Sequence, residues 1–327
     1  MRIYFMIILM AIAVIVNGCV APMKLFTDAS DPLQEFTLQG KEKGKVLIIP
    51  VRGIISDNTK KGVLRDMPSM VQEIVSQLRI AEKDEEIRAV LLKIDSPGGS
   101  TTATDILYHE IMVFKKRTGA KVVAAMMDIA ASGGYYVSLP SDLIIAHPTS
   151  ITGSIGVIFL RPKVTDLMGK IGLDIEVIKS GQNKDMGFPF RESTEEEQKI
   201  FQDLINELGG RFINLVAKHR KIDQNILSNI SSARVYLAKE ALQLGLVDEI
   251  GYLNDAIMQA KELAGLNEDC KVIVYRRTRY PNDNIYNTST TRLGSQGLSL
   301  IDLGVLDSVT SLRTGFYYLW PSIAGNK

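Results

Sequence analysis

Short apolar runs alternate with amphipathic stretches through the first half of the chain. The runs predict four strands, at 46–51, 89–94, 121–126 and 142–146. Apolar residues at helical spacing predict helices at about 67–82 and 102–117. Strands that alternate with helices are typical of βαβ units, so we expect an α/β fold with a largely parallel sheet.

The second half of the chain shows a different pattern. Thr194–Glu197 has the form of a capping box and predicts a long helix that runs to about residue 219. Residues 239–264 are helical in pattern, with breaks. Residues 276–300 are rich in Asn, Thr, Ser, Gly and Arg and predict a flexible tail, after which 315–321 turn apolar again. We expect a main domain at 45–265 and a C-terminal extension at 266–327.

The N-terminus has the pattern of an export signal. Arg2 precedes an uninterrupted apolar run of 14 residues, from Ile3 to Val16, which is shorter than the roughly 20 residues of a membrane-spanning helix. Val16–Cys19 is similar to a bacterial lipobox, in which the cysteine thiol carries lipid. The alternative is an uncleaved N-terminal anchor. Under both interpretations the chain is exported and membrane-associated, facing the periplasm or the cell exterior, with residues 20–44 as a linker.

Composition narrows the classes of function. The 327 residues include 38 basic and 37 acidic side chains, so the net charge of +1 gives no electrostatic signature of a nucleic-acid partner. The two cysteines, Cys19 and Cys270, exclude a disulfide framework and a cysteine-built zinc site. We expect no metal and no cofactor.

Two glycine-rich turns follow consecutive predicted strands, at Asp95–Gly99 and Ala131–Gly134. Ligands of open α/β sheets bind beyond the carboxyl ends of the strands, where both turns would lie. Ser132 stands at a strand-to-helix turn, and the amide of Gly133 would be a free donor at a helix N-terminus. An amide of the Gly98 turn aimed at the same point would complete an oxyanion hole. The alternative is that both are tight turns without a chemical role.

A serine nucleophile needs a base, and the sequence alone leaves its identity open. The three histidines are His109, His147 and His219, and no Gly-x-Ser-x-Gly elbow accompanies them. The other choice is a lysine that is neutral at working pH, which requires its pKa to fall from about 10.4 toward 7. Lys179 and Lys184 lie in one polar segment and are candidates, and each is equally compatible with a solvated loop.

Four sequence blocks together resemble the bacterial signal peptide peptidase A family, because they occur in the same order and at similar spacing as in that family. They are Asp95–Gly99, Asp128–Tyr136, Ile151–Val157 and Lys179–Asp185, followed by a weaker fifth block at Arg234–Asp248. The resemblance covers about residues 45–260 and is to the short, single-repeat form. It implies the βαβ spiral of Clp protease and crotonase, here with a helical C-terminal extension.

The resemblance also implies roles for particular residues. Ser132 matches the nucleophile, Lys184 the general base, and Ser154 a serine that orients the lysine amine. Gly98 and the amide of Gly133 match the oxyanion hole. The family forms homo-oligomeric rings, and in its short-form members the Ser and Lys of one site come from neighbouring subunits. Its substrates are remnant signal peptides and other apolar segments at the membrane.

Three classes of function follow from the sequence. The first is a membrane-tethered Ser/Lys peptidase that acts through an acyl-enzyme. The second is an acyl-CoA enzyme of crotonase type, and the third is a non-catalytic, ring-forming lipoprotein scaffold. We also predict that the apolar segment 316–320 reaches a substrate groove as an inhibitor or a self-cleavage site. Its alternatives are a strap across the assembly and a membrane contact.

Overall fold

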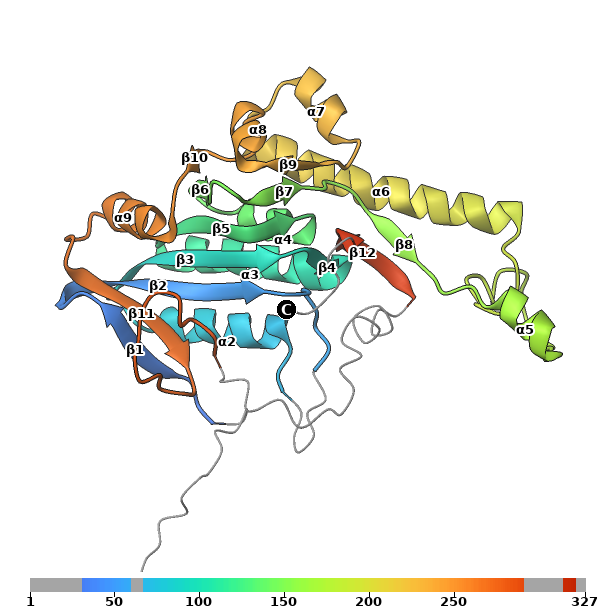
Figure 1. Cartoon of the computed structure of the whole chain (residues 1–327), viewed down its shortest axis with the longest axis horizontal. Helices are drawn as coiled ribbons and strands as arrows, with labels where there is room; N and C mark the ends of the chain where they lie inside the picture. The colour runs from blue at the N-terminus through green and yellow to red at the C-terminus, as the bar shows by residue number, and fades with distance from the viewer. Residues whose placement is uncertain (1–30, 60–66, 291–313, 322–327) are drawn as a thin grey trace, which may run out of the picture.

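The computed structural model describes residues 31–59, 67–290 and 314–321 (Figure 1). The strands in these ranges are β1 Gln34–Gln39, β2 Glu42–Arg52, β3 Ile87–Ser96, β4 Gly98–Ser100, β5 Lys121–Ala131, β6 Leu143–Ala146, β7 Ile151–Gly153, β8 Ile158–Leu160, β9 Val235–Leu237, β10 Glu249–Ile250, β11 Cys270–Arg276 and β12 Gly315–Leu319. The helices are α2 Met70–Ala81, α3 Thr101–Thr118, α4 Gly133–Ser138, α5 Thr165–Ile171, α6 Glu195–His219, α7 Gln224–Ile230, α8 Ala238–Gln243 and α9 Leu253–Leu263.

The main sheet has the order β1-β11-β2-β3-β5-β6-β10. All neighbours from β11 to β10 are parallel, and β1 pairs antiparallel with β11 at one edge. Near its carboxyl end β5 also pairs with β7, which pairs antiparallel with β9. The predicted strands and helices of the βαβ segment are therefore confirmed.

Helices cover both faces of this sheet, which explains why its central strands are apolar without interruption. Leu47 and Ile49 of β2 face a large core that includes residues of α2, α3 and α4. Val46 and Ile48 face a second core, closed by α9. In Figure 1, α9 and the α2 and α3 pair accordingly lie on opposite sides of the sheet.

Two predicted boundaries are wrong. Residues 34–44, expected in a linker, form β1 and the start of β2, because the polar β1 gains its order from pairing with β11. The segment after residue 265 begins with β11, which lies inside the main sheet, so the described extension contains strands and not helices. Cys19 lies outside the described residues, and Cys270 is a buried free thiol.

Residues 277–290, expected in the flexible tail, are ordered around Arg276. This side chain is fully buried, forms an ion pair with Asp283, and donates to the Asn287 carbonyl oxygen at 2.7 Å. Its guanidinium also stacks on the rings of Phe36 and Tyr280. The rest of the predicted tail, from residue 291, lies outside the described residues.

An arm projects from the body of the molecule (Figure 1). It consists of β8, α5, the segment up to residue 194 and the first turns of α6. The capping box of α6 is confirmed, since Thr194 accepts from the Glu197 amide and Glu197 accepts from the Thr194 amide. Of the apolar residues on the predicted helix face, Phe212 and Val216 are buried in the core. The N-terminal half of α6 therefore extends away from the body.

A second, three-stranded sheet joins the arm to the body, in the order β4-β12-β8. Its central strand, β12, pairs antiparallel with both neighbours. The ring of Phe159 on β8 stacks on Phe201 of α6 at 4.2 Å and contacts Phe316 of β12 at 4.8 Å, both between ring centroids. The apolar C-terminal segment thus closes a seam between two parts of the fold.

Candidate active site

Ser132 occupies the turn between β5 and α4. Its φ of 53° and ψ of −115° are strained for a residue with a Cβ, and its own amide donates to the Gly153 carbonyl oxygen at 2.7 Å. The side chain is 1% exposed, and its Oγ has no hydrogen-bond partner in the described part of the chain. A buried hydroxyl without a partner is uncommon and costly, which points to a group that is completed by something else.

Ser154 lies on the neighbouring strand end. Ala131 of β5 is in register with Gly153 of β7, so Ser132 and Ser154 leave adjacent parallel strands at the same level. Ser154 also has a positive φ, of 51°, and its amide donates to the Arg234 carbonyl oxygen at 2.8 Å. The structure therefore brings together these two serines of the predicted site.

Gly98 and Gly133 face each other at the same edge of the sheet. A Cβ built on Gly98 would lie 2.7 Å from the Gly133 nitrogen, and one built on Gly133 would lie 3.0 Å from the Gly98 Cα. Only glycine permits this approach. As the first residue of α4, Gly133 has an amide without an acceptor inside the helix. The Gly98 amide instead donates to Ser96 Oγ at 3.1 Å, so its role in an oxyanion hole stays a prediction.

Lys184 is the predicted site residue that the structure does not bring to Ser132. It is exposed and belongs to the segment between α5 and α6. That segment lies at the outer part of the arm, well separated from α4 in Figure 1. Its amine forms no hydrogen bond or ion pair with the described residues. Lys179, the other candidate base, is committed to an ion pair with Asp185 at 2.7 Å.

The histidines lie in other surroundings. His219 Nε2 and Tyr108 Oη are 2.8 Å apart, and burial followed by nearby Lys218 lowers the pKa of His219. His147 contacts Thr149, and His109 is exposed on α3. Since Ser132 Oγ has no described hydrogen-bond partner, none of the three acts on it in this structure.

Strand β12 lies directly on the candidate site. Tyr318 is in register with Gly99 and Leu319 with Gly98, and the Trp320 amide donates to the Pro97 carbonyl oxygen at 2.9 Å. The Tyr318 carbonyl oxygen would be 2.9 Å from a Cβ on Gly133. Segment 316–320 therefore lies beside the candidate site, within one chain. Whether this strand inhibits or is cleaved stays a prediction.

A second unpaired hydroxyl at the site was missed in the sequence. Thr104 is fully buried on α3, its Oγ1 has no hydrogen-bond partner among the described groups, and it would be 2.8 Å from a Cβ on Gly133. A threonine inside a helix gives no sequence signal of this kind, because only the packing of α3 on α4 places it there.

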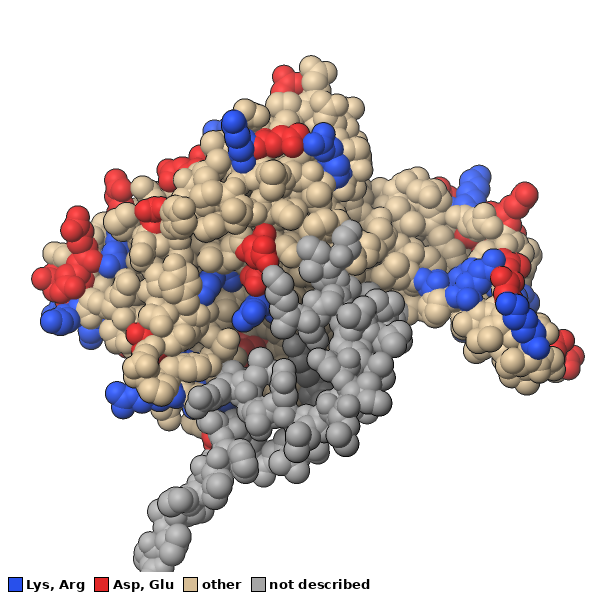
Figure 2. Space-filling model, viewed as in Figure 1, with Lys and Arg blue, Asp and Glu red and all other residues tan. Residues whose placement is uncertain are grey.

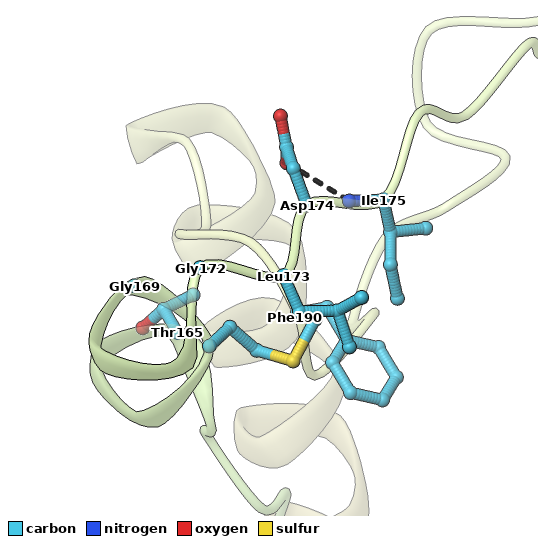
Figure 3. Close-up of a pocket in the computed structure, with 8 residues that line it drawn as sticks. Thr165, Gly169, Gly172, Leu173, Asp174, Ile175 and Phe190 are labelled. Carbon is cyan, nitrogen blue, oxygen red and sulfur yellow. Dashed lines mark hydrogen bonds between the residues drawn. The ribbon is translucent and has the colours of Figure 1, made fainter.

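The arm carries a groove of about 350 Å³ beside α5, lined by apolar and polar residues (Figure 3). Met168, Leu173, Ile175 and Phe190 line much of it. Leu173 and Ile175 are 54% and 41% exposed, and Ile178 nearby is 94% exposed. Figure 2 shows basic and acidic side chains side by side at this outer end. The arm therefore presents apolar and charged surface together, next to Lys184.

The described residues offer no competing centre of another kind. Within these ranges no group of three His, Cys, Asp or Glu side chains could hold a metal ion. Among the same residues, none of the helices has the length and apolar character needed to cross a bilayer.

Two family models match the chain. The model of peptidase family S49 matches residues 114–267, and the model of Clp protease matches residues 66–155. The first contains Ser132, Ser154 and Lys184, and the second contains both glycine-rich turns. The Clp protease/crotonase-like α/β fold expected from the sequence is thereby confirmed.

Several known proteins are similar over most of the chain. A proposed signal peptide peptidase SppA of Enterococcus faecium is 34% identical over 253 residues, which cover 77% of this chain and 73% of the relative. A proposed protease of Synechocystis is 35% identical, over 69% of this chain and 76% of the relative. The chloroplastic serine protease SPPA of Arabidopsis thaliana is 30% identical, over 82% of this chain and 39% of the relative.

A buried serine at a strained strand-to-helix turn, next to the first amide of a helix on a Clp-type fold, is typical of a serine peptidase. The matches to relatives of similar length specify the family of serine peptidases. The chain belongs to peptidase family S49, the signal peptide peptidase SppA family, in its short single-domain form. This membership favours the peptidase over the acyl-CoA enzyme and the non-catalytic scaffold.

Proposed function

We propose that the protein is a membrane-tethered signal peptide peptidase in which Ser132 of one subunit works with Lys184 of a neighbouring subunit. One observation carries the proposal: among the described residues, buried Ser132 Oγ has no hydrogen-bond partner, and the amine of exposed Lys184 has none either. A ring of identical subunits would join the two.

The reaction follows from this pairing. The neutral amine of Lys184 takes the proton of Ser132 Oγ, which attacks the peptide carbonyl and forms the C–O bond of a tetrahedral intermediate. The Gly133 amide stabilises the developing oxyanion. The C–N bond then breaks, with the lysine proton passing to the leaving amine. A water that gives its proton to Lys184 attacks the acyl-enzyme. The bond between the acyl carbon and Ser132 Oγ breaks, the proton returns from Lys184 to Ser132 Oγ, and the second product leaves as a carboxylic acid. Ser154 orients the lysine amine.

The position of β12 supports extended apolar peptides as substrates. A substrate segment would add as a strand between β4 and β8, in the manner of β-augmentation, and its main chain would run past Gly98. The surroundings of Tyr318 support this choice, because its side chain is 1% exposed and packs on Tyr136 and Phe212. Remnant signal peptides have the required apolar character. The substrate must displace β12 or find it already withdrawn.

We propose that membrane attachment is through lipid on Cys19 or through an uncleaved N-terminal anchor. Export would place the peptidase on the periplasmic or outer side of the membrane. Growth with a labelled fatty acid distinguishes the two: label lost in Cys19→Ala supports lipid, and label absent from the wild-type chain supports the anchor.

Subunit mixing tests the shared site. Ser132→Ala and Lys184→Ala are each expected to abolish cleavage of an apolar fluorogenic peptide. When the two inactive variants are unfolded and reassembled at a 1:1 ratio, a site shared between neighbours should recover about a quarter of wild-type activity, because half of the serines meet half of the lysines. Recovery of none would place both residues of a site in one subunit. Full activity of Lys184→Ala would remove lysine as the base.

A further inference from the structure

The segment that carries Lys184 is held by a network of side chains. Lys179 Nζ donates to the Gln182 carbonyl oxygen at 2.9 Å and to Asp185 Oδ1 at 2.7 Å. Gln182 and Asn183 each donate to the Glu196 carboxylate, at 2.9 and 3.4 Å. Lys184 stands between these residues, and its own side chain takes no part. The segment is therefore fixed on both sides of an amine that points to solvent.

Arg191 is the centre of this network. Its Nε and Nη2 donate to the two carboxylate oxygens of Asp185 at 2.7 and 2.8 Å, and Nη2 also donates to the Asp185 carbonyl oxygen at 3.1 Å. Its Nη1 donates to Glu197 Oε2 at 2.9 Å, and Nη2 contacts the other oxygen. Two bidentate contacts to one guanidinium fix direction as well as distance, which lysine would not do.

The other end of the network is hydrogen-bonded to the backbone at the N-terminus of α6. Glu197 is 1% exposed and belongs to the capping box with Thr194. Asp185, directly next to Lys184, has a side chain that is 9% exposed. A continuous path of contacts thus runs from the helix through Glu197, Arg191 and Asp185 to the base.

The charges around Lys184 would be unfavourable without Arg191. Asp185, Glu196 and Glu197 supply carboxylates, and Lys179 and Arg191 supply the facing cations. Hydrogen bonds from Arg191 and then from Lys179 hold the pKa of Asp185 well below its usual range. A neighbouring carboxylate favours a protonated lysine, and a general base must be neutral. A guanidinium on the carboxylate next to the base reduces this effect.

We propose that Arg191 is a positioning residue for the general base: it fixes the Lys184 segment to the N-terminus of α6 and offsets the charge of Asp185 and Glu197. The inference rests on the proposed role of Lys184. Arg191 does not contact substrate. It acts through Asp185 on the direction of the lysine amine and on the ease with which that amine loses its proton.

The test is the pH dependence of kcat/KM for an apolar fluorogenic peptide, with the full-length protein. Arg191→Gln removes one positive charge beside the base, so the acid limb should move up by about one pH unit, and kcat at neutral pH should fall about tenfold. Arg191→Lys keeps the charge and loses the bidentate geometry, so its acid limb should stay near wild type while kcat stays reduced. Asp185→Asn should move the acid limb in the opposite direction, to lower pH.

Lys163→Gln is the matched control. Lys163 pairs with Glu192 at 2.7 Å on the same arm and is 49% exposed, so its loss should leave the profile unchanged. Identical acid limbs in wild type, Arg191→Gln and Asp185→Asn would overturn the proposal, as would shifts of the same sign in both variants. If Arg191→Gln does not fold, Arg191→Lys still tests the proposal, because an unshifted acid limb together with a reduced kcat is expected only for a positioning role.

Lys184→Ala, measured in parallel, distinguishes failure of the proposed base from failure of the proposed positioning role of Arg191. An inactive Lys184→Ala with unshifted Arg191 variants would overturn only the positioning role. An active Lys184→Ala would overturn the proposed base, and the positioning role with it.

Discussion

The contact between Gly98, Gly133 and β12 gives a sharp prediction for Gly98→Ala. Gly98 has a φ of +103°, and a Cβ there would lie 1.9 Å from the Tyr318 carbonyl oxygen and 2.7 Å from the Gly133 nitrogen. Ordinary contact needs about 3.5 Å, so the Tyr318 oxygen would have to move by about 1.6 Å and the Gly133 nitrogen by about 0.8 Å. Both are main-chain atoms, which cannot yield by a rotamer change. The methyl group therefore shifts both the oxyanion donor and β12.

Gly98→Ala should lower both the free energy of unfolding and kcat, and a control variant separates these two effects. Forcing alanine into a positive φ costs about 1–2 kcal/mol of stability. Gly119, at the end of α3, has a φ of +70° and no atom within 4 Å of a built Cβ, so Gly119→Ala carries a comparable backbone cost without the clash. Displacing one oxyanion donor typically costs about 3–4 kcal/mol in the transition state, a factor of roughly 10²–10³ in kcat.

The assay is hydrolysis of an apolar fluorogenic peptide, with unfolding in urea as the stability measurement. Gly98→Ala should lose more stability than Gly119→Ala, because the main-chain clash adds to the backbone cost, and Gly98→Ala alone should lose about 10²–10³ in kcat. Activity within tenfold of Gly119→Ala would refute the placement of the oxyanion donor at Gly133. Activity above wild type would show that releasing β12 raises kcat by more than the displaced oxyanion donor lowers it, and would also refute the prediction.

Three further outcomes are expected. Arg276→Met removes a fully buried cation and leaves Asp283 unpaired, so urea unfolding should show a loss of about 2–4 kcal/mol, and an unchanged midpoint would contradict this. Burial, and next the charge of Arg52, lower the pKa of Lys93 to about 8, so stability should fall as pH drops from 10.5 through 8. Lys93→Met should make the free energy of unfolding depend less on pH over this range. An equally steep dependence in the variant would contradict its assignment to Lys93. Mass spectrometry should find C-terminal trimming in wild type and none in Ser132→Ala, and identical termini would rule out self-cleavage at β12.

Local pattern was sufficient for the parts of the fold that depend on neighbouring residues. The strands and helices from 46 to 146 and the capping box at Thr194 were predicted because periodicity and cap chemistry act over a few positions. Ser132, Gly98 and Gly133 were predicted to share one edge because the carboxyl ends of parallel strands meet there. The structure confirms that proximity.

Long-range pairing could not be predicted in the same way. The polar β1 becomes a strand only through β11, which lies more than 230 residues further along the chain, and nothing in the composition of residues 34–39 marks it. The same holds for β12 on β4. The separation of Lys184 from Ser132 depends on how far the arm projects, which no local pattern encodes. The contacts of Arg191 lie within six residues in sequence, and the capping box was the available signal for them.

The pairing of β11 with β2 has a consequence for how the chain reaches its final location. β2 lies between β11 and β3, so the middle of the sheet lacks one neighbour until residue 276 has been synthesised. Pairings of such high sequence separation form slowly, because the closure entropy must be overcome before the contacts form. For a chain that is exported as we propose, this order is useful. Slow pairing would keep the polypeptide unfolded long enough to be threaded through a translocation channel, and the groove that holds β12 would then be assembled on the far side.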